Sequence, residues 1–144
     1  MKVENILEKK GRHVDTIAPD ANVLFAVHKL TAENIGALVV SSDGVRVEGV
    51  LSERDLVRGL ARRGTDLLDA PVASVMARGV PVCSPDDLLS AVMGQMTRTR
   101  NRHLPVVVQG RLAGIVSIGD VVKHRLEEME LEVNVLRDHY IARQ

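Results

Sequence analysis

Aromatic side chains are nearly absent from this sequence of 144 residues, in which Phe25 and Tyr140 are the only two. Their scarcity argues against binding of single-stranded nucleic acid, because such binding depends on bases that stack on aromatic rings. Net charge is absent as well, since 19 basic residues balance 19 acidic ones. A neutral chain has no overall field that attracts nucleic acid or a membrane surface, so neither is an expected partner.

Cysteine is equally scarce, because Cys83 is the only one. A single cysteine excludes an internal disulfide bond and a cysteine-based zinc cluster. Long hydrophobic runs are missing too. None approaches the roughly 20 apolar residues of a membrane-spanning helix, and residues 1–5 contain no apolar signal core. The sequence therefore predicts a cytoplasmic protein without a metal site.

Aliphatic residues are what the sequence has in abundance. Hydrophobic residues make up 45% of the chain and charged residues 26%, a composition typical of a folded globular protein rather than a disordered one. A chain of this length is enough for one domain with a proper hydrophobic core.

One short pattern occurs twice. Residues 49–57 read Gly-Val-Leu-Ser-Glu-Arg-Asp-Leu-Val, and residues 114–122 read Gly-Ile-Val-Ser-Ile-Gly-Asp-Val-Val. In each copy a glycine opens an apolar run that predicts a buried strand, and Ser-x-x-Asp then predicts the start of a helix. One interpretation is a capping box, in which serine and aspartate satisfy backbone N–H groups. The other is a sugar-phosphate site, because a helix N-terminus attracts anions and a carboxylate accepts bonds from ribose hydroxyls. Both can hold together.

The rest of the chain repeats in the same order. Pro19 and Pro85, each at the end of a short strand and followed by aspartate, lie 66 residues apart, whereas Gly49 and Gly114 lie 65 apart. Each repeat is therefore predicted to run strand, helix, strand, strand, helix. A short lead-in helix is expected before each repeat, at residues 3–7 and 72–76. The predicted divisions are repeat 1 with its lead-in helix at residues 1–64, a connector at 65–71, repeat 2 at 72–126 and a C-terminal helical extension at 127–144.

The C-terminal extension is amphipathic. It places Leu126, Met129, Val133, Leu136 and Ile141 at helical spacing, with glutamates between them. A helix of this kind needs a surface to cover, either on its own domain or on a partner subunit. Together with the apolar faces of the repeats, the extension predicts a homodimer.

The two repeats together resemble a tandem CBS-domain pair, or Bateman module, named after cystathionine β-synthase. The resemblance covers about residues 3–126. It rests on the two Gly-x-x-Ser-x-x-Asp segments, the strand start Arg102-His103-Leu104-Pro105-Val106 and the strand-Pro-Asp-helix openings. It implies an α/β fold in which two repeats face each other across a pseudo-twofold axis, with clefts for adenosine-containing ligands such as AMP, ATP or NADH.

In such modules the aspartate holds ribose hydroxyls, the serine and nearby basic residues meet phosphate, and the opening strand of the opposite repeat lines the base. Carried over to this chain, the main cleft would be formed by Ser117, Asp120, Arg102, His103, Thr16, Ile17 and Ala18. The second cleft would be formed by Ser52, Arg54, Asp55, Val82, Cys83 and Ser84. Where repeat 2 has Arg102 and His103, repeat 1 has Gly36 and Ala37, which offer no side-chain donor. The main cleft is therefore expected to bind a nucleotide phosphate more tightly.

The resemblance implies a non-catalytic regulatory or energy-sensing module. Its nucleotide would shift a conformational or assembly equilibrium that an effector protein reads. An enzyme is not expected, because the sequence has no P-loop or Gly-x-Gly-x-x-Gly and its histidines lack metal-binding spacing. Cys83 is interpreted as a core thiol rather than a nucleophile. The alternative function is a structural or protein-interaction dimer without a nucleotide ligand.

Overall fold

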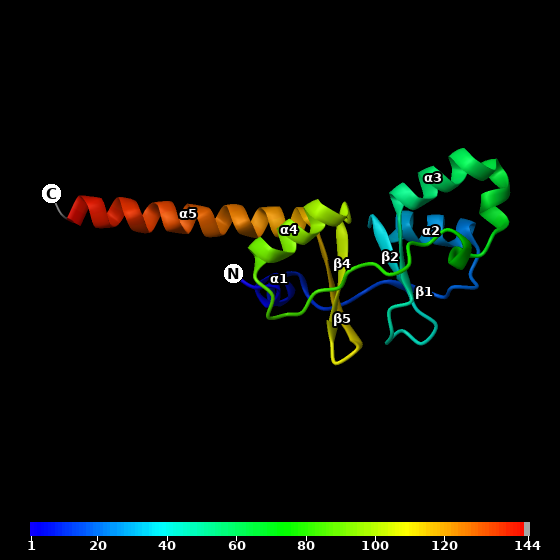
Figure 1. The fold of residues 1–144 in the computed structure, drawn as a ribbon, viewed down its shortest axis with the longest axis horizontal. Helices are drawn as coiled ribbons and strands as arrows, with labels where there is room; N and C mark the ends of the chain where they lie inside the picture. Colours follow the sequence, from blue (N-terminus) through cyan, green and yellow to red (C-terminus); the bar gives the residue numbers. More distant parts are fainter. Residues whose placement is uncertain (143–144) are drawn as a thin grey trace.

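The computed structural model describes residues 1–142, which form two α/β halves and a long helix that extends away from them (Figure 1). The elements of the first half are β1 (Thr16–Ile17), α2 (Val23–Glu33), β2 (Ala37–Val40), β3 (Gly49–Ser52) and α3 (Glu53–Arg63). The sheet order is β1-β2-β3, with β1 parallel and β3 antiparallel to β2. Every residue of β2 is buried, which explains its unbroken apolar sequence.

The second half repeats this order. Its elements are α4 (Leu89–Thr99), β4 (His103–Val108), β5 (Arg111–Ser117) and α5 (Ile118–Ala142), and β4 pairs antiparallel with β5. The place of β1 is taken by Cys83, which forms an isolated parallel bridge with Val106. The predicted α/β fold with two repeats and a C-terminal helix is thus confirmed, with the first strand of repeat 2 reduced to one bridge.

The lead-in segments pack against the opposite repeats. Helix α1 (Val3–Lys10) precedes repeat 1, but Val3, Ile6 and Leu7 are buried in the core of repeat 2. The segment 72–76 precedes repeat 2, but Val72 and Met76 belong to the core of repeat 1. The two halves therefore exchange their lead-in segments. The predicted divisions instead group each lead-in segment with the repeat that follows it in the sequence.

The glycine that opens each repeated pattern makes this exchange possible. A Cβ on Gly114 would lie 2.7 Å from Leu7 Cδ2 of α1. A Cβ on Gly49 would lie 2.7 Å from Met76 Sδ and 2.8 Å from the carbonyl oxygen of Ala77. Each distance is well inside van der Waals contact, so a larger residue would push the lead-in segment away. Both glycines thus serve the packing of the other repeat's lead-in segment.

The second lead-in segment is shorter than the predicted helix. It is a single 3₁₀ turn, η2 (Val72–Ser74), and follows a 3₁₀ segment of the connector, η1 (Gly64–Asp69). Ser74 Oγ donates to the carbonyl oxygen of Pro71 at 2.7 Å. A local bond of this kind competes with the backbone hydrogen bonds that would continue a helix.

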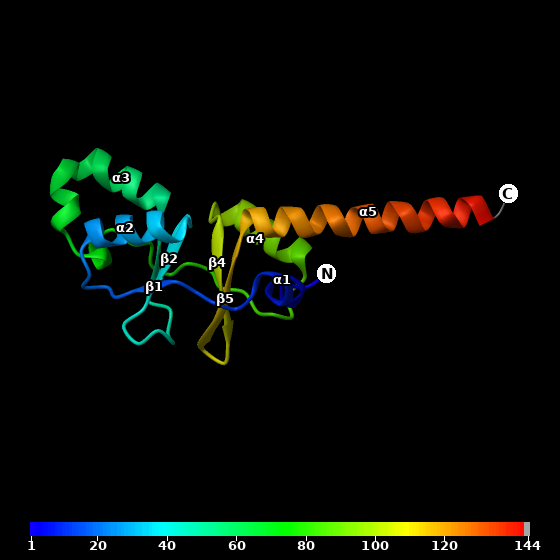
Figure 2. The same cartoon turned by 180° about the vertical axis from the view of Figure 1, so that it is seen from behind.

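Helix α5 starts in repeat 2 and runs well beyond both halves (Figures 1 and 2). Val121 and His124 are buried on the face that packs against α1 and α4. From Met129 to Ala142 every residue is exposed. Within residues 1–142, no helix combines the length and the apolar character that crossing a membrane requires.

Candidate functional site

Two clefts lie where the halves meet, and each contains one Ser-x-x-Asp helix start. The Asp55 cleft has a volume of about 360 Å³ and joins the start of α3 to the segment Thr99–His103 of repeat 2. The Asp120 cleft has a volume of about 330 Å³ and joins the start of α5 to Lys10, His13 and the segment Asn34–Ala37. Both volumes are within the range of small-molecule sites.

The two helix starts are complete capping boxes with nearly identical geometry. In α3 the Ser52 N–H donates to Asp55 Oδ2 at 2.9 Å, and the Asp55 N–H donates to Ser52 Oγ at 3.3 Å. In α5 the corresponding distances are 3.0 Å for Ser117 N to Asp120 Oδ2 and 3.1 Å for Asp120 N to Ser117 Oγ. Among residues 1–142, no protein donor bonds to Oδ1 of either aspartate. Each box therefore leaves one carboxylate oxygen available to a ligand.

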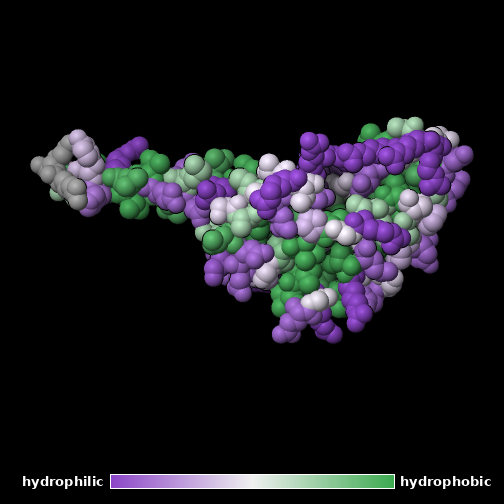
Figure 3. Space-filling view, in the orientation of Figure 1, coloured by the Kyte–Doolittle hydropathy of each residue, from purple (hydrophilic) through white to green (hydrophobic). Residues whose placement is uncertain are grey.

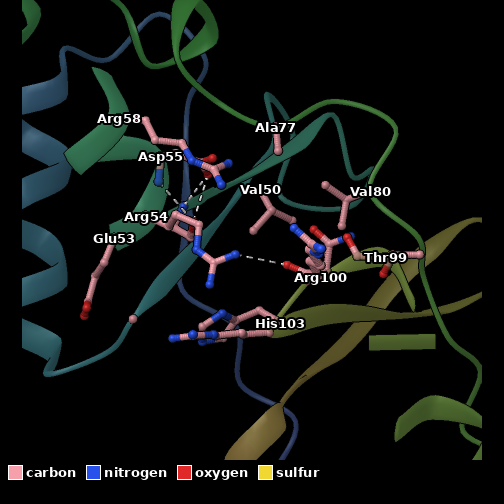
Figure 4. Close-up of a pocket in the computed structure, with 14 residues that line it drawn as sticks. Val50, Glu53, Arg54, Asp55, Arg58, Ala77, Val80, Thr99, Arg100 and His103 are labelled. Atoms are coloured by element: carbon pink, nitrogen blue, oxygen red, sulfur yellow. Dashed lines mark hydrogen bonds between the residues drawn. The ribbon is translucent and has the colours of Figure 1, made fainter. Parts of the chain in front are cut away.

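The Asp55 cleft is rich in arginine. Its wall contains Arg54 and Arg58 from α3 and Arg100 and Arg102 from the opposite repeat. Figure 4 shows Arg54 extended across the cleft, where its Nη1 donates to the carbonyl oxygen of Arg100 at 3.5 Å, the long limit of a hydrogen bond. Guanidinium groups present several N–H donors in a plane and match the oxygens of phosphate.

The Asp120 cleft has a different charge arrangement. Lys10, at the end of α1, donates to Asp120 Oδ2 at 2.7 Å. Burial raises the pKa of Asp120, but the ammonium of Lys10 and the bonds from Lys10 and Ser117 outweigh it, so the pKa is lower than usual. The carboxylate is thus charged at neutral pH and already holds a counterion from the exchanged lead-in helix.

His103 lines both clefts and stands between them. Its ring faces Gly36, because a Cβ on that glycine would lie 3.4 Å from His103 Cε1 and Nε2. Burial lowers the pKa of His103, and the positive charge of Lys10 lowers it further. The imidazole is therefore neutral at pH 7, where it can both donate and accept a hydrogen bond.

The structure brings together part of each predicted site. Ser117, Asp120 and His103 line one cleft, and Ser52, Arg54 and Asp55 line the other. Arg102 is placed differently from the prediction, because it lines the Asp55 cleft and not the Asp120 cleft. The physical reason is the apposition of the halves: the start of β4 faces the helix start of repeat 1, just as Gly36 and Ala37 face Ser117 and Asp120.

The opening strands do not line the clefts. Thr16 and Ile17 pair with β2, and Ile17 is buried in the core of repeat 1, while the cleft wall is made by the residues just before them, Val14 and Asp15. Ala18 is exposed outside that wall. In the other cleft Ala77 and Val80 take the place predicted for Val82, Cys83 and Ser84. The opposite repeat thus contributes, but through the chain that precedes each strand.

Cys83 is a core residue, as the core-thiol interpretation predicted. It is 3% exposed, and its Sγ donates to the carbonyl oxygen of Pro105 at 3.7 Å. Burial raises the pKa of this thiol to about 12, with a smaller contribution from the negative charge of Asp87. A buried, protonated thiol is typical of a core residue rather than of a nucleophile.

Several residues that line the clefts were not predicted from the sequence, namely Lys10, His13, Asp15, Arg58, Arg100 and Asn101. Arg58 carried a signal, because it lies one helical turn after Asp55 and therefore on the same side of α3. The steps of four between Arg54, Arg58 and Arg62 are also typical of a solvated helix face, so this spacing does not by itself indicate a ligand site. Lys10 and Arg100 had no sequence signal that would assign them to a cleft, since their positions depend on how the two halves meet.

The CBS domain family model matches residues 4–62 and 72–127, which together are most of the chain. The protein therefore belongs to the CBS-domain family and contains a tandem pair of these domains, which are in general regulatory modules.

Known proteins support this assignment. The crystal structure of the CBS-domain containing protein ATU1752 from Agrobacterium tumefaciens has 44% sequence identity and a TM-score of 0.83, over 87% of this chain and 99% of that one. The mitochondrial CBS domain-containing protein CBSX3 of Arabidopsis thaliana is 30% identical over 93% of this chain and 69% of its own length. Arabinose 5-phosphate isomerase KdsD of Yersinia pestis is 27% identical over 85% of this chain but only 37% of the enzyme. CBS pairs thus occur in enzymes too.

Proposed function

We propose that this protein is a regulatory module that binds an adenosine nucleotide such as AMP, ATP or NADH between its two CBS domains without transforming it. The observation that carries the proposal is the composition of the clefts. In each, an aspartate with one free carboxylate oxygen comes from one repeat, and the facing wall comes from the other. Carboxylate oxygens accept hydrogen bonds from ribose hydroxyls, and the arginines of the Asp55 cleft can donate hydrogen bonds to phosphate oxygens.

The Asp55 cleft is the tighter phosphate site in this proposal, which reverses the expectation from sequence. That expectation rested on Arg102 in the cleft of Asp120, whereas Arg102 lies with Arg54, Arg58 and Arg100 beside Asp55. In the Asp120 cleft the lysine that could meet phosphate is already paired with the aspartate. A hydrogen bond to a charged group contributes about 1.5–3 kcal/mol, so two extra arginine contacts favour the Asp55 cleft by about a hundredfold.

Nucleotide binding would act on the relative position of the two repeats. A ligand that touches Asp55 and Arg102 bridges them, so its affinity depends on how they are arranged. A ligand shifts a conformational equilibrium only by its difference in affinity for the two states, and a bridging ligand has such a difference. The effector protein that reads the shift, and the cellular compartment, remain predictions from sequence.

The test is calorimetry of the full chain with AMP, ATP, NADH and adenosine, followed by chromatography of the nucleotide after long incubation. We expect saturable binding of at least one nucleotide, weaker binding of adenosine and no product. The matched variant is Asp55→Asn, which keeps an acceptor for the cap but loses the charge. If the nucleotide were converted to product, and this activity copurified with the protein, the protein would be an enzyme instead.

The structural or protein-interaction dimer is the second candidate, and one observation favours it. Both Ser-x-x-Asp segments are fully explained as capping boxes, since each satisfies backbone donors at the start of its helix. The same calorimetry separates the two functions. At about millimolar concentration even a weak site, with a binding free energy of about 4 kcal/mol, is occupied. If no nucleotide binds at that concentration, the second function is favoured.

A further inference from the structure

Six exposed apolar residues of α5 form a seam along the helix, while Leu131, Val135 and Ile141 are exposed off it. Val122, Leu126, Met129, Val133, Leu136 and Tyr140 follow one another at alternating steps of four and three residues, and each is between 41% and 68% exposed. This spacing is the heptad repeat of a coiled coil, with Leu126, Val133 and Tyr140 at a positions and Val122, Met129 and Leu136 at d positions. Figure 3 shows apolar side chains in green along the projecting part of the helix.

The seam is separate from the face that holds α5 to its own body. Val121 and His124 are buried against the body, whereas Val122 and Leu126 are exposed. At 100° per residue, Leu126 is turned by about 160° from His124 around the helix axis. From Met129 to Ala142 every residue is exposed, and an isolated helical segment of this length is marginal in water. A partner along the seam would supply the missing burial.

The charges beside the seam identify the partner. The g positions hold Arg125, Glu132 and His139, and the e positions hold Lys123, Glu130 and Arg137. In a parallel, in-register pair of helices each g residue meets the e residue five positions later on the partner. A second copy of this chain would therefore match Arg125 with the partner's Glu130, and Glu132 with the partner's Arg137. Both pairs are between opposite charges, and Arg125 also bonds to Glu128 of its own helix.

An antiparallel pair of the same helices has the reverse character. When its apolar layers are aligned, g residues meet g residues and e residues meet e residues. Glu130 and Glu132 would then each face their own counterparts and Arg137 would face Lys123, so these contacts are between like charges, while the remaining pair, Arg125 and His139, brings no opposite charges together. Like-charge contacts of this kind are destabilising. The sequence of α5 thus selects one orientation.

We propose that α5 pairs with α5 of a second copy as a parallel, in-register coiled coil over residues 122–140. This interface gives the homodimer expected from sequence a defined geometry and is independent of nucleotide binding. The seam is less than three heptads long, so the pairing is reversible and depends on protein concentration. Two CBS pairs would then lie at the same end of the dimer, with their clefts facing the same environment.

The orientation is tested by a disulfide trap on the full chain. Leu136→Cys introduces a thiol at a d position, which meets its own counterpart only in a parallel, in-register pair. Val135→Cys is the matched control, because Val135 is the neighbouring residue and is 66% exposed against 68% for Leu136, but lies off the seam. Cys83 does not interfere, since it is buried. In a glutathione redox buffer we expect a cross-linked dimer from Leu136→Cys and little from Val135→Cys. Equal cross-linking of both variants, or of neither, would overturn the proposal.

The charge pattern is tested by light scattering and sedimentation of Glu132→Arg, Arg137→Glu and their mixture. Each single variant places like charges together in the parallel dimer, so its dimer dissociation constant should rise by roughly tenfold, whereas the mixture restores opposite charges and should associate as wild type does. In an antiparallel dimer Arg137→Glu would face Lys123 and associate more tightly, which would contradict the proposal. A trimer, a monomer at about 100 µM, or an unchanged dimer in all variants would contradict it too.

Discussion

The Asp55 cleft and the Asp120 cleft share one scaffold and differ in where their positive charges lie. Both are built on the same capping box, with bond lengths that differ by a few tenths of an ångström. In the Asp120 cleft the cation, Lys10, is bonded to the aspartate itself. In the Asp55 cleft the cations are arginines on the walls, and within residues 1–142 the side chain of Asp55 bonds only to Ser52. A duplicated scaffold can thus keep its carboxylate while the basic residues around it diverge.

This difference has a common origin in the pseudo-twofold arrangement. Each cleft takes its aspartate from one repeat and its facing wall from the other, so a substitution in one repeat alters the cleft of its neighbour. Repeat 2 contributes Arg100 and Arg102 to the Asp55 cleft, whereas the corresponding segment of repeat 1 contributes Asn34 and Gly36 to the Asp120 cleft. The following predictions test this inequality, from the largest expected effect to the smallest.

The largest effect is expected from Arg100→Ala combined with Arg102→Ala. Loss of two charged hydrogen-bond donors should weaken ATP binding by about a hundredfold, at about 1.5 kcal/mol for each donor. The binding of adenosine, which lacks phosphate, should change little. Calorimetry with both ligands measures the difference.

The matched control for this pair is Arg62→Ala combined with Arg98→Ala, which removes the same charge from exposed positions outside both clefts. If the control pair weakened ATP binding as much as the cleft pair, the effect would come from the overall field and not from contact with phosphate.

The second prediction concerns Gly114→Ala. The new methyl group would lie 2.7 Å from the buried side chain of Leu7, so this side chain or α1 as a whole must shift, and the free energy of unfolding should fall by about 2 kcal/mol. Because α1 carries Lys10, the Asp120 cleft should be disturbed while ATP binding in the Asp55 cleft is retained. Urea denaturation and calorimetry measure the two effects. Gly119→Ala is the control, since its nearest contact is at 3.7 Å and it lies in a helix, where alanine is favoured. Equal stability of the two variants would exclude a tight α1 contact.

The third prediction uses the lowered pKa of Asp120. A carboxylate with a lower pKa in the folded state than in the unfolded state stabilises the protein above its unfolded pKa, and this contribution is lost as the pH falls through its folded pKa. Wild type should therefore lose about 0.5 kcal/mol more stability than Asp120→Asn between about pH 5 and about pH 2, since the ion pair with Lys10 is partly exposed. Denaturation at several pH values provides the measurement.

The comparison variant for Asp120→Asn is Asp55→Asn, which removes a carboxylate from the same capping box without breaking an ion pair. The two variants should differ in the acid range. Identical acid profiles would show that Lys10 contributes nothing to the stability of the Asp120 cleft.

The smallest effect is expected from His103→Gln. Burial lowers the pKa of His103 in the folded state, so the unfolded state binds a proton at higher pH than the folded state does. The free energy of unfolding should therefore decrease as the pH falls through the ordinary histidine range, about 6.5, and this dependence should be weaker in His103→Gln. His139→Gln, on the exposed part of α5, is the control. An unchanged pH profile in His103→Gln would show that the ring is not desolvated.

The fold could be predicted because its signals are local. Glycine before an apolar run, serine and aspartate three residues apart, and proline after a short strand each act within a few residues of the chain, and their repetition fixed the order of elements. The helix predicted at residues 72–76 was too long because Ser74 bonds to Pro71, a choice between two local alternatives that the apolar spacing does not distinguish.

The site could be predicted only in part. Ser52, Asp55, Ser117 and Asp120 belong to helix starts, which local sequence specifies. Arg102 lines the Asp55 cleft and not the one predicted, because its neighbours depend on which repeat its strand start faces, and the period of the repeat contains no such information. Lys10 was missed for a related reason, since a residue of the lead-in helix reaches Asp120 only because that helix crosses to the other repeat.

The exchange of lead-in segments also bears on the ancestry of this architecture. A single repeat with its own lead-in segment could not complete its core, because the segment packs on a neighbour and the core lacks Val72 and Met76 or their equivalents. Two such chains could complete each other by swapping those segments, which is a domain-swapped dimer. Fusion of two copies through a connector such as residues 65–71 would then preserve the contacts of the swapped segments. The association of two molecules would become a folding step within one chain. The present chain has the architecture that such a fusion would leave.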